Sequence, residues 1–465
     1  MTDIPEQTSP AAELAGSLAT RLGEAWQVPV RVSNLRQLPG GASRETWLFD
    51  AHVPEQPSAG LILRRDPPGS PRPDNMAREA AALAAAAHAG VPVPRLYDHG
   101  SGERLLRTPY LIMERLDGET IPRRLLRDER WAAARAGLAR ELGRILARIH
   151  TIPVRAVPGL DGGDPLEQLA THYEGFGEPR PALDIGFRWL ERHRPAPTTE
   201  HVVHGDFRNG NLLIGPGGVR GVLDWELVHR GDPHEDLGWL CVKAWRFGAA
   251  APVGGFGSRV ELLDGYAEAG GTRLDPEVVR WWEVYGTLRW ALLCRSQAER
   301  HLSGAEPSVE LAALGRRVCE QEHDLLLALG LTEPQHVHDP LDGAAEQRPS
   351  AALHDRPDPG EILDAVRHYL TTELTSTADD RARFHAKVAA NALGIAQREL
   401  LLGESQRQAH QQRLAGLGCA SDAELSRAIR DGSLDGRWAE VTAAVRAAVT
   451  DKLLVANPGY LAQPG

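Results

Sequence analysis

The sequence predicts an α+β fold of two lobes, with an antiparallel sheet in the first lobe, helices in the second and an all-α bundle after them. Short apolar runs separated by turns containing Gly or Pro fill residues 23–116, which is typical of antiparallel strands. Apolar residues at helical spacing dominate residues 117–335. A stretch rich in Pro, Gly and charge, 336–359, separates a last helical segment, 360–465. We therefore expect domain boundaries at these positions, with residues 1–22 as an N-terminal helix.

Short strands and two helices make up the predicted first lobe. One helix is expected over Ala11–Leu22 and another over Met76–Ala89, where Gly90 ends it. We expect one small antiparallel sheet with the second helix packed against it. The runs assigned to strands are Val28–Leu38, Thr46–Val53, Leu61–Leu63, Leu105–Leu106 and Tyr110–Glu114.

Longer helical patterns define the second lobe and the final bundle. The pattern becomes helical over Trp131–His150 and again from Asp236 to Leu331, where Trp281–Arg300 is the longest stretch. In the bundle, helices are expected over Glu361–Leu374 and Ala439–Leu454, with a capping box at Ser421–Glu424. The bundle carries no catalytic set of residues, and we predict that it is a separate unit.

The composition excludes several classes of protein. Hydrophobic residues make up 42% and charged residues 25%, as in an ordinary globular protein. Acidic residues outnumber basic ones by 63 to 52, giving a net charge of -11, which argues against a general nucleic-acid binder. The four cysteines are scattered, so neither a disulfide framework nor a cysteine zinc site is expected. The N-terminus is polar and the Ala-rich run 80–87 is short, so we expect a cytoplasmic protein without a membrane segment. The sequence does not indicate an oligomeric state.

A cluster of Asp and Asn residues in and after His204–Asn211 predicts phosphoryl transfer. That reaction needs one carboxylate to receive or orient the attacking hydroxyl, and an amide oxygen and a second carboxylate to hold magnesium. Asp206, Asn211 and Asp224 fit these three roles. Apolar runs on both sides of Gly-Pro-Gly-Gly at 215–218 predict a hairpin that brings Asn211 and Asp224 to one end. The alternative is a polar loop whose Asp and Asn side chains only cap turns.

The motif has further members along the chain. Its residues are His204–Asn211, Val222–Glu226, Gly231–Pro233 and Asp236–Leu237. Together they resemble the aminoglycoside phosphotransferase family, which has a protein-kinase-like fold and phosphorylates small-molecule hydroxyls. Phe207–Arg208 and Asp224–Glu226 are most similar to the kinase-like domain fused to some acyl-CoA dehydrogenases. The resemblance covers about residues 20–330. The bundle resembles an uncharacterised helical domain that follows phosphotransferase domains in some bacterial proteins.

The resemblance implies a nucleotide site in the first lobe. Gly40 and Gly41, with Ser43, lie between two predicted strands, where glycine lets the backbone approach phosphates. A plain hairpin is the alternative for this turn. A kinase also needs a cation on the next strand to contact the phosphates, held by a Glu on the helix that follows.

Arginine must supply that cation because lysine is scarce. The chain has three lysines, Lys243, Lys387 and Lys452, so none precedes residue 243. This excludes a P-loop, whose Gly-rich turn needs its own lysine. Arg64 at the end of the third strand is the candidate, with Arg65 as the fallback and Glu79 as the partner. The planar fork of arginine binds phosphate well. The alternative is a surface arginine and a solvated glutamate.

The segment Tyr110–Leu116, followed by Asp117–Gly118, resembles the strand and hinge between kinase lobes. Backbone groups at Glu114 and Leu116 are then expected to contact the nucleobase. The side chains do not distinguish ATP from GTP.

The resemblance also implies roles around the reacting groups. We expect Asp206 to accept or orient the proton of the hydroxyl, and Arg208 to contact the transferring phosphate or to form an ion pair within the loop. His204 is expected to orient the loop and Asp236 to brace it. Glu226 could assist a second metal or remain solvated.

The expected cofactors are ATP, or GTP, and Mg²⁺, and the expected partner is a small molecule with a hydroxyl group. The resemblance implies a hydroxyacyl thioester or a related metabolite. Aminoglycosides are the alternative acceptors, although no dense acidic run marks a cleft for them. A non-catalytic nucleotide-binding scaffold is a third hypothesis. Four tryptophans could line an apolar pocket or belong to the core: Trp245, Trp281, Trp282 and Trp290.

Overall fold

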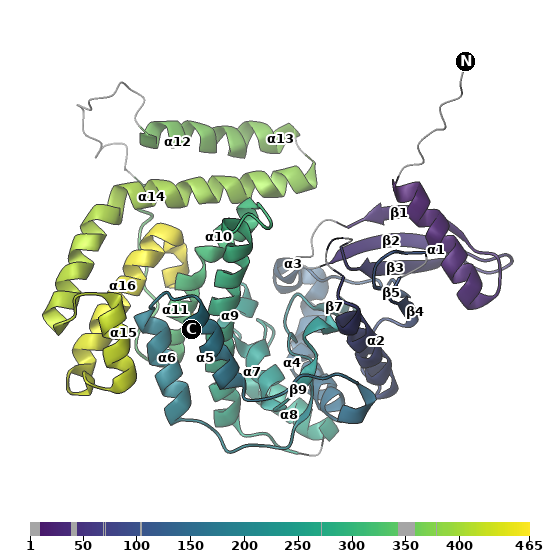
Figure 1. Cartoon of the computed structure of the whole chain (residues 1–465), viewed down its shortest axis with the longest axis horizontal. Coiled ribbons are helices and arrows are strands. Elements are labelled where there is room, and N and C mark those ends of the chain that lie inside the picture. Colours follow the sequence, from purple (N-terminus) through teal and green to yellow (C-terminus); the bar gives the residue numbers. More distant parts are fainter. Residues whose placement is uncertain are drawn as a thin grey trace.

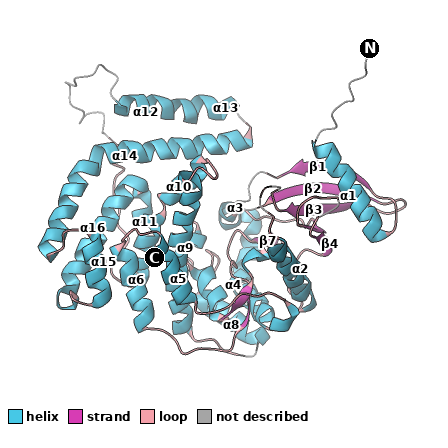
Figure 2. Ribbon diagram, in the orientation of Figure 1, coloured by secondary structure: helices cyan, strands magenta, loops and turns pink. Residues whose placement is uncertain are grey.

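The computed structural model describes residues 10–38, 44–67, 69, 71–102, 105–270, 272–342, 359–377 and 379–465. It confirms an α+β fold with a sheet-containing N-lobe, a helical C-lobe and further long helices (Figure 1). The strands gather in the N-lobe, whereas the C-lobe is nearly all helix (Figure 2).

Five antiparallel strands form the N-lobe sheet, in the order β1-β2-β3-β5-β4. Helix α1, Pro10–Trp26, covers one face and buries Leu18 and Leu22 against the sheet. Helix α2, Pro73–His88, packs on the other face, because Met76 shares a core with Leu111 and Met113. The strands are β1 Arg31–Gln37, β2 Glu45–His52, β3 Ala59–Arg65, β4 Leu96–Gly100 and β5 Tyr110–Glu114.

One predicted strand is wrong. Leu105–Leu106 is not a strand, and the fourth strand is β4, at the edge of the sheet. Leu106 is buried in a turn against the core between α1 and the sheet, and the next residue, Arg107, has φ 61°. An edge strand pairs on one side alone and can carry Asp98 and His99, so it lacks the apolar pattern that marks central strands. Helix α1 also extends to Trp26, four residues beyond the predicted end at Leu22.

The C-lobe is built around helix α9, Pro276–Leu302. Helices α4 and α8 approach closely at glycines. A Cβ at Gly265 would lie 2.0 Å from the carbonyl oxygen of Arg140, and one at Gly143 would lie 2.1 Å from that of Leu262. The other helices are α3 Pro122–Arg127, α4 Ala132–His150, α5 Pro165–Gly175, α6 Pro181–Arg192, α7 His234–Cys241, α8 Arg259–Gly270, α10 Val309–Gly315 and α11 Val318–Ala328.

Two short pairs of strands in the C-lobe frame the catalytic motif. Strand β6, His201–Val203, pairs with β9, His229–Gly231. Strands β7, Leu212–Gly215, and β8, Gly218–Val222, form an antiparallel hairpin. The polar loop at 204–211 therefore lies between β6 and β7.

The C-terminal helices are α12 Pro359–His368, α13 Thr375–Thr377, α14 Asp380–Leu417, α15 Asp422–Asp431 and α16 Trp438–Ala456. Helix α12 lies alongside α14 in a layer beside the C-lobe (Figure 1). We expected a separate unit, but α14–α16 share one hydrophobic core with Ile185 of α6 and Leu326 of α11. Helical spacing locates an apolar face but does not show which partner covers it. Residues 343–358, in the predicted linker, lie outside the described residues.

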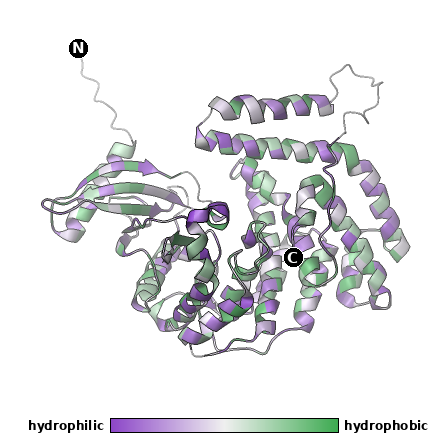
Figure 3. Cartoon of the chain, turned by 180° about the vertical axis from the view of Figure 1, so that it is seen from behind, coloured by the Kyte–Doolittle hydropathy of each residue, from purple (hydrophilic) through white to green (hydrophobic). Residues whose placement is uncertain are grey.

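Two further features of the fold concern membrane-spanning helices and cysteines. Within the described ranges, no helix combines the length and apolar character needed to cross a membrane, and polar positions interrupt the long helices throughout (Figure 3). The four cysteines are free and buried.

Candidate active site

Asp236, at the start of α7, anchors the catalytic loop to the C-lobe. Its carboxylate accepts the backbone N–H groups of His204, at 2.8 Å, and Gly205, at 2.9 Å. His150 Nε2 lies 3.2 Å away on the other side. Burial raises the pKa of Asp236, but the hydrogen bonds and the charge of His150 outweigh burial and lower it. The loop backbone is therefore fixed by a buried, ionised carboxylate.

Three donors hold the side chain of Asp206. Trp239 Nε1 and Arg208 Nε each donate to Oδ1 at 2.9 Å, and Asn211 Nδ2 donates to Oδ2 at 2.6 Å. The Asp206 side chain is 14% exposed. Trp239 on α7 was not predicted as a site residue, because no local spacing relates it to the motif. The carboxylate therefore has a fixed orientation at the edge of the loop.

Arg208 forms the ion pair with Asp206 that was one of its two predicted roles. Its guanidinium also lies 4.5 Å from the ring centroid of Trp245. Trp245 packs against Trp239 at 5.2 Å and Trp290 at 4.7 Å. An aromatic cluster thus lies directly beside Asp206. The other two predicted tryptophans, Trp281 and Trp282, belong to a different core between α5, α6 and α9.

The hairpin brings the two predicted metal ligands to one end. The backbone N–H of Leu223 donates to the carbonyl of Asn211 at 2.9 Å, next to the last pair of the β7–β8 ladder. Asp224 follows with φ 63°, a left-handed conformation that turns the chain sharply. His204 Nε2 donates to the Leu223 carbonyl at 3.1 Å and Nδ1 accepts the Asp206 N–H. Burial lowers the pKa of His204, so the neutral ring spans the loop and the hairpin.

Arg64 from the N-lobe reaches this end of the hairpin. Its Nη1 donates to Glu79 at 2.6 Å and its Nη2 donates to Asp224 at 2.8 Å. Arg65 instead pairs with Glu45 at 2.7 Å, so Arg64 is the arginine beside the motif. Burial raises the pKa of Asp224, but the charge of Arg64 outweighs burial and lowers it. Burial likewise disfavours the Arg64 cation, yet the charges of Glu79 and Asp224 raise its pKa.

A second arginine that the sequence did not point to also binds Glu79. Arg44 is buried, contacts Glu79 and lies 3.2 Å from Asp66. Glu79 is therefore shared by two guanidinium groups. Arg44 comes directly after the predicted phosphate loop, but no spacing rule marks it. Gly40, Gly41 and Ser43 lie outside the described residues.

The predicted hinge joins the two lobes. Glu114 ends β5 opposite Leu61 of β3, and its N–H donates to the Arg95 carbonyl at 2.8 Å. Leu116 lies over the hairpin, since a Cβ at Gly221 would be 3.1 Å from its Cδ1. The segment then pairs with β7 through two hydrogen bonds between Glu119 and Ile214, at 2.9 and 3.0 Å.

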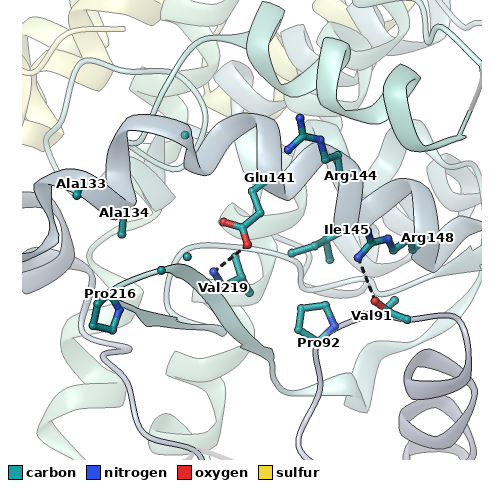
Figure 4. A pocket seen from close by; sticks show the side chains of 14 residues that line it. Val91, Pro92, Ala133, Ala134, Glu141, Arg144, Ile145, Arg148, Pro216 and Val219 are labelled. Carbon is teal, nitrogen blue, oxygen red and sulfur yellow. Dashed lines mark hydrogen bonds between the residues drawn. The ribbon is translucent and has the colours of Figure 1, made fainter.

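An open cavity of about 790 Å³ lies at the other end of the hairpin, between its turn and α4 (Figure 4). Glu141 Oε1 accepts the Val219 N–H at 3.0 Å, and Arg148 donates to the Gly90 carbonyl at 3.1 Å. Arg144 on the same helix also lines it. Its described lining does not include Asp206, Asn211 or Asp224. This cavity is therefore separate from the polar cluster.

A smaller cavity of about 320 Å³ adjoins the back of the catalytic loop. Arg289 lines it and donates to the Gly205 carbonyl at 3.0 Å. His229 and Glu235 line it too, with their side chains 3.0 Å apart. Burial lowers the pKa of His229, but the charge of Glu235 outweighs burial and raises the pKa to about 9. The His229–Glu235 pair and Arg289 therefore stabilise the catalytic loop at the Gly205 carbonyl.

Comparison with known proteins shows which family the chain belongs to. A model of the phosphotransferase enzyme family matches residues 34–282, more than half of the chain. The chain belongs to this family. Residues 376–460 match a domain of unknown function, DUF6285.

Curated relatives include acyl-CoA dehydrogenase family proteins. Member 10 from mouse is 29% identical over 238 residues, covering 48% of this chain and 21% of the relative. Member 11 from chicken is 26% identical over 343 residues, covering 67% of this chain and 42% of the relative. The chain thus spans less than half the length of these relatives.

A solved structure supports the fold. A candidate aminoglycoside phosphotransferase from Ralstonia eutropha superposes with a TM-score of 0.51 at 22% identity, covering 67% of this chain and 98% of that protein.

Proposed function

We propose that this protein transfers the γ-phosphoryl group of ATP, or of GTP, to the hydroxyl group of a small molecule. The observation that carries the proposal is the double contact of Arg64, which binds Glu79 in the N-lobe and Asp224 in the C-lobe. It combines the phosphate-binding cation, its glutamate partner and a metal-type carboxylate in one cluster, as phosphoryl transfer requires. Membership of the phosphotransferase family supports this reading.

Asp206 is suited to accept the proton of the attacking hydroxyl. An ionised carboxylate offers about four acceptor positions, and three donors occupy three of them here. We propose that a substrate hydroxyl takes the remaining acceptor position. Arg208 lies next to Asp206 and would also neutralise charge on the transferring group.

Asn211 and Asp224 are suited to hold Mg²⁺. They contribute an amide and a carboxylate oxygen at one end of the hairpin, and the lowered pKa of Asp224 keeps it ionised. The amide nitrogen of Asn211 is committed to Asp206, which leaves its oxygen as the acceptor. Mg²⁺ is commonly held by one or two protein carboxylates together with substrate phosphates, where it neutralises phosphate charge.

A hydroxylated acyl thioester is the acceptor class that we propose first. The chain resembles part of proteins named as acyl-CoA dehydrogenase family members. Phosphorylation of a hydroxyl group on such a thioester is a reaction that this site could perform beside acyl-CoA chemistry.

The proposal is tested by calorimetric titration of ATP and GTP with and without Mg²⁺. We expect binding of at least one nucleotide, strengthened by Mg²⁺, and a loss of about tenfold or more in Asp224→Ala, which removes a charge-assisted contact. Arg64→Gln should weaken ATP binding similarly, whereas its matched control Arg65→Gln should not. If neither nucleotide binds, the non-catalytic scaffold hypothesis replaces this proposal.

Acceptors are then compared by the release of ADP. The proposal expects turnover with hydroxyacyl-CoA thioesters and little with aminoglycosides. Turnover confined to aminoglycosides, together with raised tolerance in expressing cells, would instead establish the antibiotic-modifying alternative.

A further inference from the structure

Helix α11 buries five consecutive polar residues between the C-lobe and the C-terminal helices. Residues 320–324, with the sequence Glu-Gln-Glu-His-Asp, are all at most 4% exposed. Such a run is expensive to bury unless each charge has a partner. Its partners therefore indicate what this helix joins.

Each of the three carboxylates accepts one partner from the C-lobe and one from the C-terminal helices. Glu320 pairs with Arg317 at 2.8 Å and Asn457 at 2.9 Å, and Glu322 with Arg180 at 3.2 Å and Lys452 at 2.9 Å. Asp324 accepts from Lys243 at 2.7 Å and from the Tyr460 hydroxyl at 2.6 Å. The C-terminal segment is thus joined to the C-lobe by polar contacts with three buried carboxylates as well as by the apolar core that they share.

The Asp324 connection leads toward the active site. Lys243 begins the 3₁₀ turn Lys243–Arg246, and its ammonium also lies 4.1 Å from the ring centroid of Tyr460. At the other end of the turn, Arg246 donates to the Cys241 carbonyl at 2.9 Å and to Glu283 at 2.8 Å. Trp245 lies between these two anchored side chains, so the position of its ring depends on both.

Trp245 contacts both of the donors that fix Oδ1 of Asp206. It packs on Trp239 at 5.2 Å and supports the Arg208 guanidinium at 4.5 Å. Trp239 and Arg208 each donate to Asp206 at 2.9 Å. A continuous series of contacts therefore runs from Tyr460 to Asp206.

We propose that Tyr460 is a positioning residue for Asp206, acting through Asp324, Lys243 and the ring of Trp245. The C-terminal segment then stabilises the turn that carries Trp245, which gives a role to the matched domain of unknown function. For its catalytic meaning this inference rests on the proposed phosphotransferase function.

The physical basis is that a buried ion pair is stable only when its remaining hydrogen-bonding groups also have partners. Lys243 is 8% exposed, and its charge is tolerable in that position because Asp324 faces it. Without the Tyr460 hydroxyl, the Asp324 carboxylate loses a short hydrogen bond that the protein interior cannot replace. The pair then loosens, and the turn that carries Trp245 can shift.

The test uses the full chain labelled with 5-fluorotryptophan and examined by ¹⁹F NMR. Trp239→Phe and Trp245→Phe assign the two resonances. We expect Tyr460→Phe to shift both. The matched control is Tyr173→Phe, since the Tyr173 hydroxyl also donates to a buried aspartate, Asp184, at 3.2 Å. Asp184 forms an ion pair with Arg430 of α15, so it too joins the C-lobe to the C-terminal helices. This control should leave both resonances in place.

Activity provides the second measurement. With MgATP, Tyr460→Phe should lower kcat by roughly threefold to tenfold and leave KM for ATP unchanged. The rate is measured for phosphoryl transfer to an acceptor, or for ATP hydrolysis with water as the acceptor. If Tyr460→Phe does not fold, Asp324→Asn takes its place in both measurements. Unchanged Trp239 and Trp245 resonances would overturn the proposal. A clear shift in a protein without ATP turnover would instead leave the connection standing and remove the proposed function.

Discussion

The catalytic loop and helix α11 both bury aspartates, but they stabilise them in different ways. Asp236 accepts two backbone N–H groups that lie 31 and 32 residues away in the sequence. Asp324 relies on two side chains, Lys243 and Tyr460, which lie 81 and 136 residues away. Burial raises the pKa of both, yet the net shift is downward for Asp236 and upward for Asp324.

This difference shows how firmly each region is held. Asp236 is stabilised first by His150 and then by the two amides, which the backbone holds in place directly after β6. Long side chains must lose conformational freedom before they can pair. The catalytic loop is therefore held by contacts within the C-lobe, whereas α11 depends on helices contributed much later in the chain.

Asp206→Asn should have the largest effect and tests whether this loop is the catalytic element. An asparagine keeps the shape but cannot accept the proton of the attacking hydroxyl. We expect kcat to fall by about a thousandfold with ATP affinity retained, as for loss of a general base. Steady-state kinetics and calorimetry on one preparation measure both quantities. Substantial remaining turnover would show that the loop only positions other groups.

Asp236→Asn should destabilise the fold by about 3 kcal/mol. The asparagine side chain would turn an N–H group toward the backbone N–H of His204 or Gly205, which needs an acceptor. Since its pKa is lowered, the Asp236 contribution is present above the usual value of 3.8 and is lost as the pH falls through the folded pKa. Urea unfolding at neutral pH measures the loss. Asp264→Asn, a half-exposed pair with Arg140, is the matched control and should change stability by at most about 1 kcal/mol. An equal loss of stability in the two variants would show that Asp236 stabilises the fold no more than a surface ion pair does.

His323 on α11 should make stability depend on pH. Burial, together with the charge of Lys243, lowers its pKa from 6.5 to about 4. The neutral ring therefore stabilises the fold fully above pH 6.5, and that stability is lost as the pH falls toward 4. Linkage gives a loss of about 2 kcal/mol between pH 8 and pH 5. His323→Gln should lack this component in urea unfolding at the two pH values; an unchanged pH dependence would place its origin elsewhere.

Lys452→Met should have the smallest effect and sharpens the account of α11. Lys452 is 42% exposed, and Glu322 keeps Arg180 when the lysine is removed. We expect a loss of at most about 1 kcal/mol by thermal or urea unfolding. A loss of several kcal/mol would mean that Arg180 alone cannot stabilise the buried Glu322 carboxylate.

Much of the fold and of the motif could be predicted because the signals are local. Asp206, Asn211 and Asp224 lie within twenty residues, and a Gly-Pro-Gly-Gly turn brings Asn211 and Asp224 to one end of a hairpin. The Arg64–Glu79 pair followed from the order of a strand and the next helix. The roles of these residues in catalysis remain predictions, and Gly40, Gly41 and Ser43 lie outside the described residues.

The remaining features depend on contacts between distant segments. Trp239 touches Asp206 across 33 residues, and Arg44 reaches Glu79 across 35, with no periodic pattern to mark either. The edge strand β4 lacks an apolar pattern, whereas the apolar pair Leu105–Leu106 lies in a turn. The polar run at 320–324 is typical of an exposed helix face until its partners are known.

The core shared by α6, α11 and α14–α16 affects how the protein folds as it is made. Ile185 and Leu326 find their apolar neighbours, such as Leu453 and Leu461, once those residues have left the ribosome. The N-lobe, whose sheet and α1 lie within 114 residues, can fold early in synthesis. We expect this apolar face of the C-lobe to stay uncovered during synthesis until α14–α16 emerge, and chaperone protection to matter most in that interval.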